Sequence, residues 1–169
     1  MKILIAVESH FQEYGGPYTA ITQKIEFLNK KKIINKLIYN KNKNYSYNLD
    51  LNFIISNYDV IHIYGIWKPF LIKVYRVAKS LNKKIICSPI GALEPWSLSQ
   101  KKIKKTIAWH AYQKKMLNNV DIVHATSEIE AKNVLDKGIK TKVEIIGHGL
   151  EIDKNFTPEL KRKTKKNIL

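Results

Sequence analysis

Cysteine and long apolar runs are scarce in this sequence of 169 residues. The one cysteine, Cys87, excludes an intramolecular disulfide and is typical of a cytosolic protein. No stretch of 18 or more apolar residues occurs, so the sequence predicts no transmembrane helix. The apolar run near the N-terminus, residues 3–7, is too short for a signal peptide. We therefore expect a cytoplasmic protein.

Arginine is also rare: Arg76 and Arg162 are the only arginines among 30 basic side chains, although the net charge is +16. Such a positive charge suggests an anionic partner. Sequence-specific nucleic-acid binders favour arginine, however, because its planar guanidinium matches phosphate and guanine edges. The abundant lysine, isoleucine and asparagine share AT-rich codons, so genome composition explains part of the charge. A basic nucleic-acid binder is therefore the least favoured functional class.

Patterns for metal binding and nucleophilic catalysis are missing as well. The five histidines, His10, His62, His110, His124 and His148, show no metal-ligand spacing. His62 and His124 occupy alternate positions of predicted strands, where hydrogen-bonded core histidines are expected. His10 and His148 fall in predicted loops, where a structural role and a site role both stay open. No nucleophile–base pair is recognisable, so we assign no catalytic residue and expect no metal or cofactor.

The sequence does contain a regular alternation of strand-like and helix-like segments. Strands are predicted at residues 2–7, 33–39, 59–65, 84–92, 120–127 and 142–147. Helices are predicted from Pro17 to Leu28 and at residues 49–57, 68–82, 100–119 and 128–138, the last with Ser127 as its N-cap. This pattern predicts one α/β domain over residues 1–152, a Rossmann-like parallel sheet of about six or seven strands with helices on both faces.

Two adjacent glycines, Gly15 and Gly16, follow the first predicted strand in the stretch YGGPYTA. Glycine lets the backbone turn sharply and lets a ligand approach its N–H groups. The N-terminus of the following helix would favour a phosphate. A simple tight turn is the alternative. Because ligands of parallel α/β sheets bind at the carboxyl ends of the strands, we expect any binding site at that edge.

Five segments, taken in chain order, resemble the N-terminal domain of glycosyltransferase family 4. They are YGGP (14–17), DVIHIYGIW (59–67), SPIGALEPWSLSQKKIKKTIAW (88–109), HATSEIEA (124–131) and VEIIGHGLE (143–151). The family consists of retaining sugar transferases with two facing Rossmann-like domains, the GT-B fold. The resemblance implies the acceptor-side half of a sugar-nucleotide-dependent hexosyltransferase, of the kind that builds polysaccharides.

The resemblance also implies a set of substrate-binding residues at the cleft between the domains. These are Gly15, Gly16, Trp67, Gly91, Glu94 and Trp96. For Glu94 and Trp96, the alternative is that they fix a turn around Pro95. The sugar nucleotide would be the donor substrate, and the acceptor would be a glycan or a lipid-linked molecule.

Two departures from the family pattern bear on activity. Ile90 stands where the family has a histidine that faces the transferred sugar, and isoleucine cannot form hydrogen bonds. Residues 153–169 resemble a basic linker or tail toward a C-terminal, nucleotide-sugar-binding domain that this sequence does not include. We therefore expect a chain that is inactive alone and has a separate nucleotide-sugar domain or subunit as partner. A non-catalytic glycan- or partner-binding module, a pseudoenzyme of this fold, is the alternative.

The predicted helix 100–119 is strongly basic. Lys101, Lys104, Lys105 and Lys115 fall within an arc of about 100° on an ideal helix. A solvated face is one interpretation. The other is peripheral docking on an anionic membrane, such as the inner face of the cell membrane.

Overall fold

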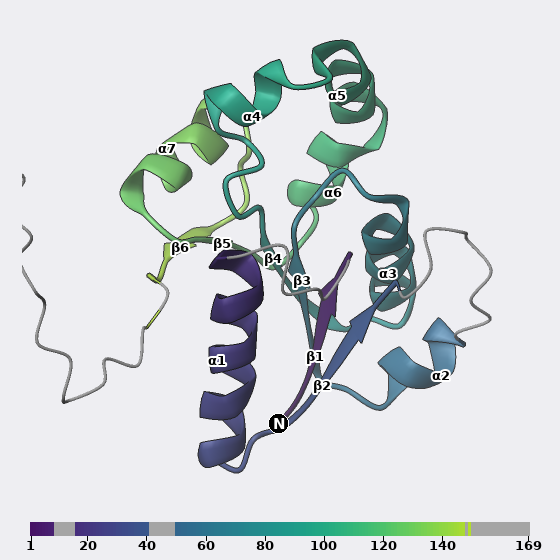
Figure 1. Ribbon diagram of the computed structural model, residues 1–169. Helices are drawn as coiled ribbons and strands as arrows, with labels where there is room; N and C mark the ends of the chain where they lie inside the picture. The colour runs from purple at the N-terminus through teal and green to yellow at the C-terminus, as the bar shows by residue number, and fades with distance from the viewer. Residues whose placement is uncertain (9–15, 41–49, 148, 150–169) are drawn as a thin grey trace, which may run out of the picture.

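The strands of this protein form one parallel sheet (Figure 1). The computed structural model describes residues 1–8, 16–40, 50–147 and 149, so the predicted linker 153–169 lies outside the described residues. The strands are Lys2–Val7 (β1), Ile34–Tyr39 (β2), Val60–Tyr64 (β3), Lys84–Ser88 (β4), Ile122–Ala125 (β5) and Val143–Ile145 (β6). Their order is β2-β1-β3-β4-β5-β6, and every neighbouring pair is parallel. The predicted sheet is confirmed.

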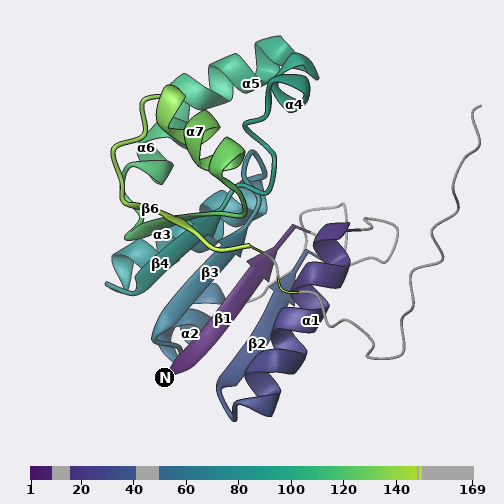
Figure 2. The same ribbon diagram turned by 90° about the vertical axis from the view of Figure 1, so that its left-hand side faces the viewer.

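Helices cover both faces of the sheet, as the sequence predicts. Helix α1 lies on one side, and α2 and α3 lie on the other (Figure 2). The helices lie on opposite faces because crossovers between parallel strands are right-handed. The chain moves one way along the sheet from β1 to β2 and the opposite way from β3 to β6, so the connecting helices fall on different sides. The helices are Gly16–Lys30 (α1), Leu51–Ser56 (α2), Pro69–Ser80 (α3), Pro95–Ser99 (α4), Lys102–Ala108 (α5), Lys114–Leu117 (α6) and Glu128–Asp136 (α7). Within the described ranges, no helix is long and apolar enough to cross a membrane.

Strand β1 shows why the apolar runs are continuous. Leu4 and Ala6 pack into the cluster shared with α2 and α3, whereas Ile3, Ile5 and Val7 pack into the cluster shared with α1. Successive side chains of a strand point to opposite faces, and here both faces are covered. An alternating polar pattern would therefore leave polar groups in one of the two cores.

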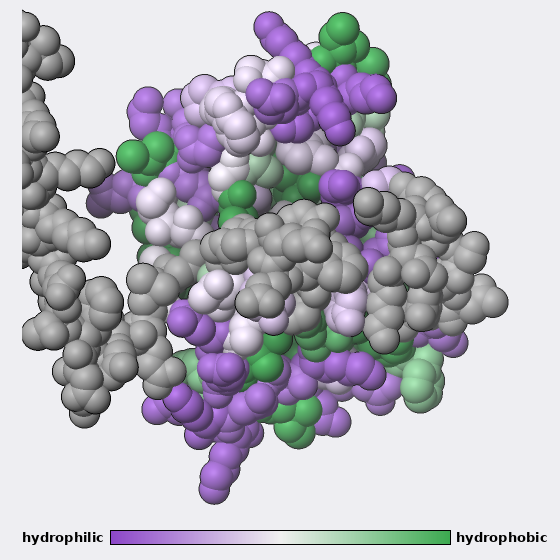
Figure 3. All heavy atoms as spheres, in the orientation of Figure 1, coloured by the Kyte–Doolittle hydropathy of each residue, from purple (hydrophilic) through white to green (hydrophobic). Residues whose placement is uncertain are grey.

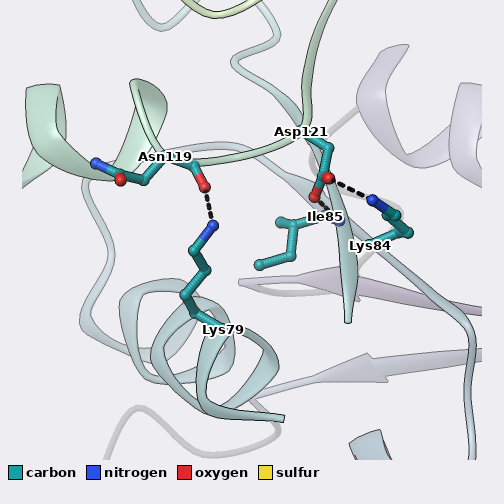
Figure 4. Close-up of polar contacts among 5 residues, drawn as sticks. All are labelled: Lys79, Lys84, Ile85, Asn119 and Asp121. Carbon is teal, nitrogen blue, oxygen red and sulfur yellow. Dashed lines mark hydrogen bonds and ion pairs between the residues drawn. The ribbon is translucent and has the colours of Figure 1, made fainter. Parts of the chain in front are cut away.

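A carboxylate ties the amino ends of β4 and β5 together (Figure 4). Asp121 accepts a hydrogen bond from the backbone N–H of Ile85 at 2.9 Å and one from the ammonium of Lys84 at 3.1 Å. On α3, the ammonium of Lys79 donates to the carbonyl of Asn119 at 2.7 Å. Partial burial opposes the charged form of Asp121, but the Ile85 hydrogen bond and the lysine charges outweigh it and lower its pKa.

Replacing Asp121 with asparagine should cost about 1 kcal/mol of unfolding free energy at neutral pH. A carboxyl whose pKa is lowered by folding stabilises the native state above its unfolded pKa of about 3.9, and this contribution disappears as pH falls through the folded value. The stability difference between the wild type and Asp121→Asn should therefore shrink below about pH 4. Urea denaturation at several acidic pH values measures this. A difference that is independent of pH would contradict the prediction.

The helix predicted over residues 100–119 is confirmed as a helical segment from Lys102 to Leu117, but it is not a regular α-helix throughout. Lys101 adopts a left-handed backbone conformation with φ of 53°, so α5 begins only at Lys102. A π-helical turn, Trp109–Gln113, then separates α5 from α6. Its wider turn rotates the following residues relative to an ideal α-helix. Lys115, which follows this turn, is therefore rotated away from its ideal position, Lys101 precedes the helix, and Lys105 turns inward to contact Ser97, so the predicted arc of four lysines is wrong.

Candidate functional site

The order of the strands marks one edge of the sheet as the candidate site. From β1 the chain goes to β2 on one side and later returns to β3 on the other. Such a switch point opens a crevice outside the carboxyl ends of the two strands, where α/β proteins bind ligands. Gly16 opens α1 beyond the end of β1, and Trp67 follows β3. Gly15, like His10 and His148, lies outside the described residues.

Two loops at this edge have an unusual backbone. Gly65 and Trp67, after β3, have φ of 92° and 76°, and Ile90 and Gly91, after β4, have φ of 50° and 67°. Left-handed conformations are rare for residues with a side chain, and more so for a β-branched residue such as Ile90. Such strain persists only where the surroundings enforce it, and it concentrates at functional sites. The other described residues with positive φ lie at helix ends.

Trp67 is held in its conformation by contacts from two directions. Its backbone N–H donates to Oε1 of Gln113 at 3.1 Å, and its indole N–H donates to the carbonyl of Ala92 at 3.4 Å. Its ring lies 6.1 Å from that of Trp109, centroid to centroid, and 5.8 Å from the ammonium of Lys105. The indole thus connects the β3 loop to the β4 loop. The sequence did not indicate Gln113, because only the π-helical turn aims its buried side chain at Trp67.

The remaining predicted site residues follow β4. Gly91 lies beside Glu94, since a Cβ added to Gly91 would lie 3.7 Å from Cγ of Glu94. That distance is ordinary contact, so the positive φ rather than lack of space favours glycine there. Trp96, on α4, is 77% exposed. The structure thus places the described predicted residues on segments that follow strand carboxyl ends and joins Trp67 to the Gly91 loop. Their role in binding stays a prediction.

A buried carboxylate on α7 fixes the loop that follows β4. Glu130, on α7, is only 3% exposed. It accepts hydrogen bonds from the backbone N–H of Gly91 at 2.8 Å, from the backbone N–H of Thr126 at 2.8 Å and from the Thr126 hydroxyl at 2.7 Å. Ser127 caps the helix by accepting from the Glu130 N–H at 3.2 Å, as predicted. Glu130 therefore joins the carboxyl ends of β4 and β5.

A cavity of about 630 Å³ lies elsewhere, on the face of the sheet that carries α1. Aliphatic side chains of the strands form much of its wall, including Ile86 and Ile122. Its polar lining includes Lys24, His62 and His124. Of the predicted site residues that the structure describes, none lines this cavity. The sequence did not predict it, because it depends on α1 covering only part of that face.

A chain of hydrogen bonds crosses the sheet beside the cavity. Ser88 Oγ lies 2.7 Å from Nε2 of His62 and 2.7 Å from Nδ1 of His124. His62 Nδ1 lies 3.1 Å from the Lys24 ammonium, and His124 Nε2 lies 2.7 Å from the carbonyl oxygen of Ile146. Both histidines are buried, which confirms that they are hydrogen-bonded core residues.

With both imidazoles neutral and Lys24 charged, the two ends of this chain set the direction of its hydrogen bonds. The carbonyl of Ile146 only accepts, so His124 donates from Nε2 and accepts at Nδ1 from the Ser88 hydroxyl. Ser88 then accepts from Nε2 of His62, whose Nδ1 accepts from the ammonium of Lys24. One arrangement satisfies all four contacts, running from α1 across β3, β4 and β5 to the residue after β6.

Lys24 should make stability depend on pH in the alkaline range. Burial lowers its pKa from 10.5 to about 8, because the ammonium loses hydration beside His62 and Tyr64. Below pH 8 the buried Lys24 ammonium destabilises the native state. As pH rises above 8, the native state loses this proton while the unfolded chain keeps it, so the free energy of unfolding increases. Between about pH 7 and pH 10, the wild type should gain about 2 kcal/mol of stability relative to Lys24→Met. Urea denaturation of both proteins tests this, and parallel pH profiles would contradict it.

The described residues offer neither a metal centre nor a reactive thiol. In this part of the chain no group of three or more His, Cys, Asp or Glu side chains is arranged to hold a metal ion. Cys87 is fully buried, and burial together with the charge of Glu130 raises its pKa to about 12. The thiol is therefore protonated at neutral pH and unreactive as a nucleophile.

Comparison with known proteins gives one family and one fold. The model of Glycosyltransferase Family 4 matches residues 13–154. No curated protein matches the chain significantly. Two solved structures of Anabaena Alr3699/HepE, one in complex with UDP and glucose and one with UDP-glucose, are 15% identical, with TM-scores of 0.57 and 0.58. The matches cover 89% of this chain but 45% and 44% of those chains, so this chain spans less than half their length. Since the family match extends over most of the sequence, the chain belongs to glycosyltransferase family 4, as a Rossmann-like domain of the GT-B type.

Proposed function

We propose that this domain forms the acceptor side of a retaining hexosyltransferase that uses a sugar nucleotide as donor. The observation that carries the proposal is the pair of left-handed loops after β3 and β4, which Gln113 and Glu130 hold beside the switch point. These loops present Trp67 and the backbone of Gly91 at the edge where α/β proteins bind ligands. The solved structures of similar fold contain UDP with glucose, or UDP-glucose, which supports a sugar nucleotide as the donor.

Transfer requires donor and acceptor to be held together. Positioning two reactants contributes effective molarities of about 10⁵–10⁸ M, or roughly 7–11 kcal/mol of the barrier. In our proposal this domain supplies one wall of the cleft, and a nucleotide-sugar-binding domain or subunit supplies the other. The 169 residues alone are then inactive.

The buried, reduced Cys87 supports a cytoplasmic location.

Binding of acceptors to the chain tests the proposal. Amide NMR spectra would be recorded while a panel of oligosaccharides and lipid-linked sugars is added. We expect an acceptor to shift the resonances of Trp67 and Gly91, and Trp67→Ala to weaken its binding about tenfold. The matched control is Phe53→Ala, an exposed aromatic on α2, which should leave binding unchanged. Binding that shifts only residues of other surfaces would overturn the site assignment.

A non-catalytic binding module is the second candidate, and Ile90 favours it. The Ile90 side chain packs against the apolar cluster shared with α1. This position therefore offers no hydrogen-bonding group to a sugar. A pseudoenzyme would bind acceptors at the same edge but would transfer no sugar even when a donor domain is supplied.

A further inference from the structure

Three large apolar side chains are exposed on α4 and α5, which contact each other: Trp96, Ile103 and Ile107, called the α4–α5 ridge here. These side chains are 77%, 77% and 64% exposed, respectively. Ile103 and Ile107 are four residues apart and share one face of α5. Figure 3 shows hydrophobic atoms next to strongly hydrophilic ones over α5, at the top of the molecule. Two neighbouring isoleucines that remain in water on a helix without any buried residue need an explanation.

Contacts of Lys105 fix which way the ridge points. Its ammonium donates to the Ser97 carbonyl and lies 3.2 Å from the Ser97 hydroxyl and 5.8 Å from the centre of the Trp67 ring. Lys105 therefore faces the body of the protein. Ile103 and Ile107 each lie two residues from it, about 160° around the helix. The inward anchoring of Lys105 thus directs both isoleucines into solvent.

The segment that carries the ridge is strongly basic. Between Glu94 and Asp121 the sequence contains no acidic residue, and it contains six lysines. Lys101, Lys102 and Lys104 are exposed and belong to the same short segment as the two isoleucines. Aliphatic side chains flanked by lysines are typical of helices that lie in the interface of an anionic membrane.

We propose that the α4–α5 ridge docks on the surface of a membrane that contains anionic phospholipids. Ile103, Ile107 and Trp96 enter the boundary between headgroups and acyl chains, while Lys101, Lys102 and Lys104 contact the headgroup phosphates. The exposed aliphatic pair favours lipid over nucleic acid as the partner. Proteins bind single-stranded nucleic acid mainly through phosphate contacts and through stacking of bases on aromatic side chains, and isoleucine provides neither. A second copy of this chain is disfavoured because it would bring two basic surfaces together.

Docking at this ridge would place the candidate site close to the lipid. Helix α4 begins four residues after Gly91, and Lys105 connects α5 to Trp67. The edge that carries the β3 and β4 loops would therefore lie near the headgroups. Trp96 is also one of the predicted site residues, but Ile103, Ile107 and the three lysines are not, so variants of these five residues test docking independently of the proposed sugar transfer.

Vesicle binding by the full chain tests the proposal. Vesicles of phosphatidylglycerol mixed with phosphatidylcholine would be compared with vesicles of phosphatidylcholine alone, by sedimentation at physiological salt. Each lysine near an anionic surface strengthens binding about fivefold. We expect the triple variant K101Q/K102Q/K104Q to bind the anionic vesicles at least about tenfold more weakly. The matched control K31Q/K32Q/K36Q removes the same charge from exposed positions elsewhere and should change binding less than about twofold.

A second pair of variants isolates the apolar contribution. I103Q/I107Q keeps every charge and should weaken binding at least about fivefold. Its control is I129Q/L135Q, which changes two apolar side chains of α7 that are 69% and 53% exposed, and it should bind like the wild type. Trp96 fluorescence should shift to the blue on the anionic vesicles, and Trp96→Phe should remove that shift. Circular dichroism shows whether each variant remains folded.

Several results would overturn the proposal. Equal weakening by the two lysine triples would mean that the overall charge, not the ridge, attracts the vesicles. Unchanged binding of I103Q/I107Q would mean that no apolar insertion occurs. Equal binding to phosphatidylcholine alone would remove the role of the anionic headgroups. If K101Q/K102Q/K104Q weakened binding to single-stranded RNA while leaving vesicle binding unchanged, the surface would be a nucleic-acid site.

Discussion

Replacing Glu130 with alanine is expected to lower the free energy of unfolding by about 4 kcal/mol. The side chain is 3% exposed and accepts three hydrogen bonds, from Gly91 N–H, Thr126 N–H and the Thr126 hydroxyl. Alanine would leave these three donors without their carboxylate. Hydrogen bonds to a charged group each contribute about 1.5–3 kcal/mol, and partial access of water reduces the sum. For a domain of this size the melting temperature should fall by about 8–16 °C.

The matched control for this prediction is Glu128→Ala. Glu128 is exposed in the first turn of the same helix, so its removal should cost only about 0.5 kcal/mol, through the helix dipole. Thermal and urea denaturation followed by circular dichroism measure both variants. Similar losses for Glu128→Ala and Glu130→Ala would show that the buried carboxylate does not fix the β4 loop.

Replacing Ser88 with alanine is expected to cost about 3 kcal/mol. The Ser88 hydroxyl is completely buried and donates to His124 while accepting from His62. Alanine removes both hydrogen bonds at once, and the space that a hydroxyl leaves is small for a water molecule. Two imidazole nitrogens would then lose this partner in a region of low dielectric, where the loss is largest.

Ser80→Ala is the control for the removal of a hydroxyl. Ser80 is exposed on α3 and donates to the carbonyl of Val77 at 2.9 Å, so its loss should stay within about 0.5 kcal/mol. Urea denaturation at neutral pH compares the two variants. A loss below about 1 kcal/mol for Ser88→Ala would contradict the ordered hydrogen-bond chain from Lys24 to Ile146.

The sequence was sufficient to predict the sheet and its order of elements. Strands buried on both faces favour continuous apolar runs; such a run occurs at β1, and a single buried histidine interrupts it in β3 and in β5. Ser127 was recognisable as an N-cap because a hydroxyl directly before a helical pattern satisfies a free N–H group. Gly138, with φ of 72°, follows the C-terminus of α7, where a left-handed glycine commonly ends a helix.

The candidate site was less predictable, because it depends on exceptions to local rules. No propensity indicates that Trp67 or Ile90 adopts a positive φ, since tertiary contacts enforce it. The π-helical turn that aims Gln113 at Trp67 has no sequence pattern either. Glu130 was visible in the segment HATSEIEA, but its bond to Gly91 joins residues 39 positions apart.

The basic helix shows a different kind of failure. An ideal periodicity of 3.6 residues places Lys105 with the exposed lysines and the isoleucines elsewhere. In the structure, Lys105 contacts Ser97 and Trp67, and Ile103 and Ile107 are exposed. Periodicity alone does not show which side of such a helix faces the protein; here the contacts of Lys105 with Ser97 and Trp67 decide it.

Sugar transfer by the purified 169-residue chain tests most directly whether it forms one side of a transferase cleft. The chain would be incubated with UDP-glucose and other sugar nucleotides and with a panel of glycan and lipid-linked acceptors, with and without the nucleotide-sugar-binding domain of a family 4 enzyme. We expect no transfer above background by the chain alone. We expect transfer when a matching domain is present, and its loss with Trp67→Ala but not with Phe53→Ala. Robust turnover by residues 1–169 alone would contradict the half-cleft proposal, because a complete active site would then lie within this one domain.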